Sequence, residues 1–133
     1  MLYEKRVFKT KTFDRWAKGV LSDDQLCAAA KEVLAGMVET DLGGGICKKR
    51  IAVKGGGKSG GTRVLIAKQN LLGLFFLAGR QKSGPGTDFT TDQIEAAKIV
   101  GRGLNRADGA HVNVLLAAGT IREICNEGKE IHG

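Results

Sequence analysis

The sequence predicts an α+β fold: one domain in which helices cover one face of a small antiparallel sheet. Three observations lead to this prediction. Four short segments carry the alternating or β-branched apolar pattern of strands, with glycine-rich turns between them. Four other segments carry the helical spacing of apolar residues, three of them behind Ser or Thr capping candidates. The chain has 133 residues, 42% of them hydrophobic, so residues 1–133 can form a single domain around one core.

The predicted elements run in the order strand, two helices, three strands, two helices. Their expected ranges are 2–9, 12–19, 23–37, 46–53, 62–68, 74–80, 92–104 and 111–118. The first strand rests on the alternation of apolar residues. Thr10 or Thr12 can cap the first helix, which Gly19 ends. Phe13 and Trp16 lie three positions apart in that helix, so they share a face and we interpret them as core anchors.

The second helix has a clear start. Ser22 is its expected N-cap, and Asp23 and Asp24 follow in the first turn, where the helix dipole favours acidic side chains. Its apolar stripe consists of Leu26, Ala29, Ala30, Val33 and Leu34.

The central strands follow a glycine-rich turn, DLGGG at 41–45. The mixed pattern of 46–53 indicates a strand with one exposed basic face. The segments 62–68 and 74–80 each contain a continuous apolar run, and a short connection with Asn70 joins them, which favours a hairpin. We expect this hairpin to form the centre of the sheet.

The C-terminal part is expected to be helical and then irregular. Thr91 is the expected cap of the helix over 92–104, and a last helix covers 111–118. Residues expected to face the core from the first of these helices are Ile94, Ala97 and Ile99. A polar tail from about residue 120 is expected to be flexible.

The stretch IAVKGGGKSGGTRVL at 51–65 contains a loose form of the phosphate-binding pattern G-x-x-x-x-G-K-[ST]. A P-loop requires a helix that starts at the Lys-Ser pair. Here Gly60 and Gly61 follow, and then the strand-forming TRVLIA. The pattern therefore predicts a turn between two strands, carrying Lys54 and Lys58, and not a nucleotide site.

Positive charge is concentrated in the middle of the chain. The net charge of +7 comes from residues 42–87, which hold nine Lys and Arg and no acidic residue. Both ends of the chain are close to neutral. Such a segment favours a polyanionic partner, for which a nucleic-acid backbone is the leading interpretation and an acidic protein the alternative.

The three cysteines Cys27, Cys47 and Cys125 show no metal-ligand spacing and are odd in number. We interpret them as reduced thiols, without a disulfide framework or a zinc site, in a cytoplasmic protein. The longest apolar run, around 71–78, is far shorter than a membrane span, and no export signal is visible. The histidines His111 and His132 lie outside the basic segment and are not assigned to catalysis.

The segments FKTKTFDRWAKG, SDDQLCAAAKEVLAGM, DLGGGICKKRIAVKGGGKSGGTRVLIA and FFLAGRQKS resemble the RelE/ParE superfamily of type II toxins, and within it the HigB-like branch. The resemblance covers about residues 7–105. It implies a compact fold of the RelE and microbial-ribonuclease type. It also implies a cytoplasmic toxin that cleaves mRNA on the ribosome and thereby inhibits translation, without a metal or other cofactor. A cognate antitoxin would neutralise it, and a homodimer or a heterotetramer with the antitoxin is the expected assembly.

The resemblance also implies a set of site residues. The expected catalytic residues are Lys58, Arg63 and Lys82. The expected nucleic-acid-binding residues are Lys48, Lys49, Arg50, Lys54, Lys68 and Arg80. Cleavage through the ribose 2′-OH needs a base, an acid and cations that stabilise the charge developing on phosphate, and this family uses Lys and Arg for these tasks.

Two other functions stay open. A ParE-like toxin would share the fold but inhibit DNA gyrase by binding. A degenerate member would bind nucleic acid or antitoxin without cleaving RNA. The second alternative rests on 83–86, which read SGPG where relatives often continue with a further basic residue, and on Thr62, which stands where many relatives have Tyr.

Overall fold

The computed structural model describes residues 5–52, 61–81 and 88–126. In these residues the chain forms an α+β fold, as predicted, with a six-stranded sheet and four helices. The elements in chain order are β1 (Arg6–Thr10), α1 (Lys11–Ala17), α2 (Asp23–Leu34), β2 (Thr40–Gly43), β3 (Ile46–Ile51), β4 (Thr62–Ala67), β5 (Gly73–Gln81), α3 (Thr91–Asn105), α4 (Gly109–Ala118) and β6 (Ile121–Ile124).

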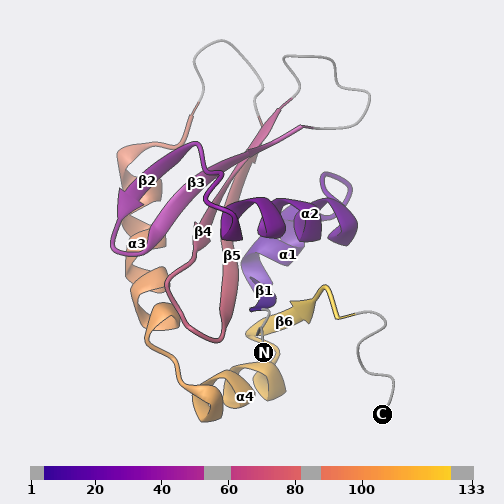
Figure 1. Ribbon diagram of the computed structural model, residues 1–133, viewed down its shortest axis with the longest axis vertical. Helices are drawn as coiled ribbons and strands as arrows, with labels where there is room; N and C mark the ends of the chain where they lie inside the picture. The colour runs from indigo at the N-terminus through magenta and orange to yellow at the C-terminus, as the bar shows by residue number, and fades with distance from the viewer. Residues whose placement is uncertain (1–4, 53–60, 82–87, 127–133) are drawn as a thin grey trace.

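The sheet has the strand order β2-β3-β4-β5-β1-β6 (Figure 1). The predicted antiparallel arrangement holds for β2 to β5 and for the β1–β6 pair. It is wrong for β1 and β5, which pair in parallel, with Phe8 opposite Phe75. A long connection through two helices and three strands brings β1 back beside β5, and a connection of this length permits parallel pairing.

Helices cover both faces of the sheet, so the expectation of one covered face is wrong (Figure 1). α1 and α2 pack on one face and α3 and α4 on the other. Successive residues of β4 point to opposite faces: Val64 joins the core under α1 and α2, and Leu65 joins the core under α3. The uninterrupted apolar run of β4 is typical of a strand buried on both faces.

The N-terminal helices begin as predicted. Thr10 caps α1 by accepting a hydrogen bond from the Phe13 N–H, and Ser22 caps α2 in a capping box with Gln25. Phe13 is fully buried, with its ring centroid 5.4 Å from that of Trp16. These caps fix where each helix leaves the sheet.

Gly79 of β5 makes room for α1. A Cβ atom at this position would lie 2.0 Å from Cζ3 of Trp16. The indole therefore packs directly on the backbone of β5, which no larger residue at position 79 would permit without displacing α1.

Several element boundaries and orientations differ from the prediction. The segment 41–45 is not only a turn, because residues 40–43 form β2 and pair with β3. Thr90, not Thr91, caps α3. Ile99 and Leu34, which were expected to face the core, are exposed.

The C-terminal segment also differs from the prediction. Residues 121–124 form β6, an edge strand paired with β1, where a flexible tail was expected. Cys27 and Cys125 form a disulfide, so the interpretation of these two cysteines as reduced thiols is wrong. Cys47 is a free, buried thiol, as expected. Among the described residues, no helix is long and apolar enough to cross a membrane.

Candidate nucleic-acid interface

Three arginines lie side by side across the central strands. Arg50 of β3 is the register partner of Arg63 of β4, and Arg63 is in turn the partner of Arg80 of β5. Register partners project to the same face, which here is the face covered by α3, because Leu65 two residues after Arg63 packs there. We call Arg50, Arg63 and Arg80 the arginine row.

The arginine row opposes the stability of the sheet. Like charges directly opposite one another on neighbouring strands repel, and here this happens twice in succession. In addition, Nε of Arg80 is buried without a hydrogen-bond acceptor among the described residues. A buried donor without a partner is costly, and an anion at the row would supply the missing acceptor.

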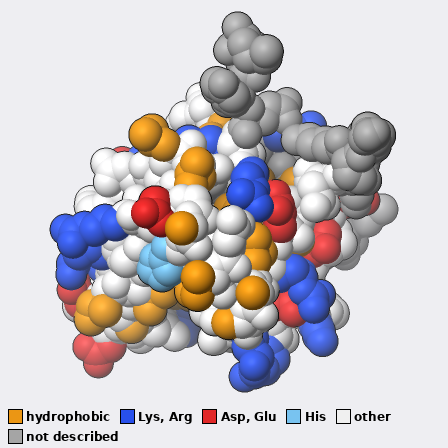
Figure 2. Space-filling view, turned by 90° about the horizontal axis from the view of Figure 1, so that it is seen from below, with side chains coloured by type: hydrophobic (Ala, Val, Ile, Leu, Met, Phe, Trp, Pro, Cys, Tyr) orange, Lys and Arg blue, Asp and Glu red, His pale blue; other side chains and the backbone are white. Residues whose placement is uncertain are grey.

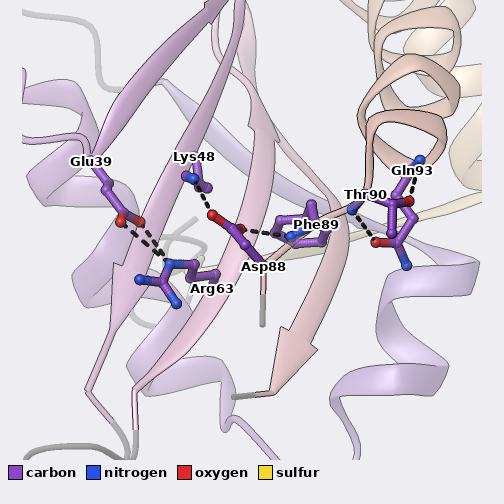
Figure 3. A network of polar contacts seen from close by, with 7 residues as sticks. All are labelled: Glu39, Lys48, Arg63, Asp88, Phe89, Thr90 and Gln93. Carbon is purple, nitrogen blue, oxygen red and sulfur yellow. Dashed lines mark hydrogen bonds and ion pairs between the residues drawn. The ribbon is translucent and has the colours of Figure 1, made fainter. Parts of the chain in front are cut away.

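Two carboxylates contact the cations of this region (Figure 3). Nε of Arg63 lies 3.2 Å from Oε1 of Glu39, and Nζ of Lys48 lies 2.7 Å from Oδ2 of Asp88. The side chains of Arg63 and Lys48 are only 17% and 13% exposed, so both ion pairs are screened less than surface pairs. Each of these two carboxylates thus contacts one cation of the region, while the register keeps Arg50, Arg63 and Arg80 side by side.

The start of α3 holds Asp88 in place. Thr90 caps the helix in a capping box with Gln93, and the Phe89 N–H donates to Oδ1 of Asp88 at 2.7 Å (Figure 3). Burial alone would raise the pKa of Asp88, but the hydrogen bonds from Lys48 and the Phe89 N–H outweigh it and hold the pKa below its ordinary value. Asp88 is therefore ionised at neutral pH and unsuited to act as a general base.

The structure brings four of the predicted site residues together, namely Lys48, Arg50, Arg63 and Arg80. Lys49 points to the opposite face, where its Nζ lies 2.6 Å from Oε1 of Glu32. Lys68 follows the far end of β4, about 16 Å along the strand from Arg63, and pairs with Asp41. Period-two alternation explains the separation of Lys48 from Lys49.

Lys54, Lys58 and Lys82 lie outside the described residues. The chain enters and leaves their segments at residues 52, 61 and 81, beside the arginine row, because Ile51 pairs with Thr62 and Thr62 with Gln81. The strand β4 is already formed at Thr62, which agrees with the prediction that the Gly-Lys-Ser segment does not lead into a P-loop helix.

The end of the molecule opposite the arginine row has a surface of mixed charge. The helix α4 lies there and carries His111, which is exposed (Figure 1). Seen from this end, basic, acidic and apolar side chains are intermixed (Figure 2). His111 is thus far from the arginine row, in line with its exclusion from the catalytic candidates.

The sequence analysis did not identify the carboxylate that contacts Arg63. That carboxylate belongs to Glu39. Glu39 directly precedes β2, a strand that the polar sequence TDLG does not reveal. Asp88 could have been found as the first acidic residue after the basic segment, two residues before a helix cap.

Comparison with known families places the chain in a family. The family model described as RelE toxin of the RelE / RelB toxin-antitoxin system matches residues 5–124. The chain belongs to the RelE toxin family. Membership identifies the protein as a toxin of a toxin-antitoxin system and implies a cognate antitoxin as its partner. A search of curated proteins found no match.

Proposed function

We propose that this RelE-family toxin is a ribosome-dependent, metal-independent endoribonuclease that cleaves mRNA in the cytoplasm and so inhibits translation. The arginine row carries the proposal, because the strand register places Arg50, Arg63 and Arg80 side by side on one face of the sheet. Guanidinium groups recognise phosphate by paired hydrogen bonds. The HigB-like branch is the proposed position within the family.

The proposed roles follow the needs of phosphodiester cleavage by the ribose 2′-OH. Arg63, at the centre of the row, stabilises the charge that develops on the phosphate oxygens. Lys58 contacts the phosphate, and Lys82 supplies a further cation. A lysine whose pKa is lowered by these neighbouring positive charges accepts the 2′-OH proton.

A binding-only member of the family is the second candidate, and one observation favours it. Glu39 and Asp88 occupy hydrogen-bonding positions of Arg63 and Lys48 that a phosphate would need. If these carboxylates stay in place when RNA binds, the interface holds the strand without supplying enough positive charge for cleavage.

The test adds the purified toxin to a bacterial translation extract and maps new mRNA 5′ ends by primer extension. Arg63→Ala is compared with Lys68→Ala, which removes one cation of the same basic segment at the far end of β4. We expect wild type and Lys68→Ala to cleave, and Arg63→Ala to cleave about two to three orders of magnitude more slowly. A reaction without ribosomes should show no new ends.

The other outcomes identify the alternatives. Equal cleavage by Arg63→Ala and wild type would remove the arginine row from the mechanism, and cleavage without ribosomes would contradict the ribosome requirement. Intact mRNA in all reactions would reject the nuclease. A gyrase supercoiling assay then separates a ParE-like inhibitor, which blocks supercoiling, from a member that only binds RNA or antitoxin.

A further inference from the structure

The Cys27–Cys125 disulfide joins two parts of the chain that are 98 residues apart. Cys27 lies within α2, and Cys125 is the first residue after β6. The bond is therefore the covalent link between the C-terminal edge strand and the helix layer that covers one face of the sheet.

The segment that this bond holds is the edge of the sheet. β6 has β1 as its one neighbouring strand, and its four residues pair from Ile121 with Thr10 to Ile124 with Val7 (Figure 1). Arg6 and Glu123 add an ion pair of 2.8 Å, in which both side chains are partly exposed. Ile121 and Ile124 are 2% and 5% exposed and anchor β6 in the core, but a four-residue strand at the edge of a sheet is still the kind of element that opens locally.

The backbone at the attachment point is strained. Cys125 has φ 68°, in the left-handed region, and it is the one non-glycine residue with positive φ in the described part of the chain. Only glycine, and sometimes Asn or Asp, adopts this region readily. The disulfide offsets the cost of this conformation, so Cys125 is expected to relax when the bond opens.

The clamped segment also forms part of a pocket on the opposite face of the sheet. Thr120 and Ile121 line a pocket of about 550 Å³, together with residues of β5, α3 and the start of α1. The N–H of Lys11, the first residue of α1, donates to the carbonyl oxygen of Thr120 at 2.9 Å. Opening of β6 would therefore remove one wall of this pocket.

The remaining cysteine does not compete for the bond. Cys47 is fully buried, and burial raises the pKa of its thiol to about 11. A thiol of this kind is a poor nucleophile, since thiol–disulfide exchange proceeds through the thiolate. Cys27 and Cys125 are partly exposed to solvent, unlike Cys47.

We propose that Cys27 and Cys125 form a reversible redox clamp, which fastens β6 to α2 when oxidised and lets β6 and its pocket wall open when reduced. In reduction, the thiolate of a small thiol attacks one sulfur, the S–S bond breaks, and the other cysteine leaves as a thiolate that takes up a proton. A second thiolate then attacks the sulfur of the first small thiol in the mixed disulfide, and the remaining protein cysteine leaves as a thiolate that takes up a proton. Two electrons and two protons pass from the small thiols to the protein, and the small thiols leave joined as a disulfide.

Hydrogen exchange on the full chain tests this proposal. The protein is oxidised with glutathione disulfide or reduced with dithiothreitol, and amide exchange is followed by mass spectrometry in peptides from β6 and from α3. We expect the oxidised protein to be 2 Da lighter. Reduction should accelerate exchange in 121–125 by about tenfold or more, while α3 stays unchanged.

Two variants control for other causes. Cys27→Ser/Cys125→Ser should exchange fast in β6 under both conditions, and Cys47→Ala should respond like wild type. Three alkylatable thiols after oxidation, unchanged exchange in β6 on reduction, or equal acceleration of all amides would each overturn the clamp. The proposal is independent of whether the protein cleaves RNA, because none of these measurements involves RNA.

Discussion

The two faces of the sheet differ in how their cations are arranged. Under α1 and α2, each buried cation meets a carboxylate: Lys49 lies 2.6 Å from Glu32, and Lys9 lies 2.6 Å from Asp14 and 2.7 Å from Asp23. On the face of α3, Lys48 and Arg63 also meet carboxylates, but the strand register places Arg63 directly between Arg50 and Arg80.

The difference indicates which face of the sheet mainly supports the stability of the fold. Paired cations satisfy the demands of a folded core. A row of like charges lowers the stability of the sheet, so a requirement outside folding must account for it. The face under α3 is therefore the candidate interface, and the face under α1 and α2 is its structural support.

The largest effect is expected when one substitution on each face of the sheet is compared, because one should affect cleavage and the other should affect stability. Arg63→Ala should lower mRNA cleavage by about two to three orders of magnitude and change the free energy of unfolding by less than about 1 kcal/mol. Lys49→Met should lower the free energy of unfolding by about 1–2 kcal/mol, because the carbonyl oxygen of Met37 loses its donor and Glu32 its partner.

Urea unfolding and primer extension on both variants give the two quantities. Cleavage is corrected for the folded fraction, so that an unstable variant is not mistaken for an inactive one. If Arg63→Ala lost as much stability as Lys49→Met, or Lys49→Met lost cleavage per folded molecule, the separation of an interface from its support would not stand.

The elements that sequence could predict are those encoded by local patterns. The capping box at Ser22, the apolar runs of β4 and β5 and the helical spacing of α2 each specify their structure within a few residues. The strands β2 and β6, TDLG and IREI, have four residues each and depend on partners elsewhere in the chain. The disulfide depends on the same tertiary contacts, because spacing alone cannot show which cysteines meet.

The candidate site was predictable in composition but not in arrangement. The acid-free segment 42–87 identifies Arg50, Arg63 and Arg80 as separate candidate site residues. Only the strand register shows that they are neighbours. The bulge between Leu65 and Ile66 shifts that register, and no sequence pattern predicts this bulge. The contact of Arg63 with Glu39 was missed for a similar reason, since it depends on where β2 pairs.

A pH titration of stability tests whether the face of the sheet under α1 and α2 excludes water. Cys47 lies on the same face of β3 as Lys49, and burial raises the pKa of its thiol to about 11. Above the ordinary thiol pKa of about 8.5, the unfolded chain loses this proton while the folded protein keeps it. The unfolded state then binds fewer protons, so the free energy of unfolding falls as the pH rises toward 11.

The expected loss is about 2–3 kcal/mol between pH 8 and pH 10.5, measured by urea unfolding. Cys47→Ala removes this contribution and keeps all other titrating groups, so the difference between the two slopes isolates the thiol. Identical slopes would mean that water reaches Cys47, and the face under α1 and α2 would not be the dry support inferred here.

The smallest effect concerns the packing of α3 over the arginine row. A Cβ atom at Gly103 would meet nothing within 4 Å, whereas one at Gly101 would lie 2.3 Å from Cδ1 of Ile46. Gly103→Ala should therefore raise the free energy of unfolding by up to about 1 kcal/mol, through helix propensity alone. Gly101→Ala should lower it by about 1–3 kcal/mol, because the buried Ile46 side chain must be displaced or α3 must move away from β3.

The pair is informative because the start of the same helix holds Asp88 beside Lys48. Thermal unfolding gives the stabilities, and the cleavage assay shows whether displacement of α3 reaches the interface. If Gly101→Ala cost no stability, the close approach of α3 to β3 would be incorrect. If it cost stability but left cleavage per folded molecule unchanged, the interface would depend on the register of the strands and not on the helix above them, which is the outcome that the arginine row itself favours.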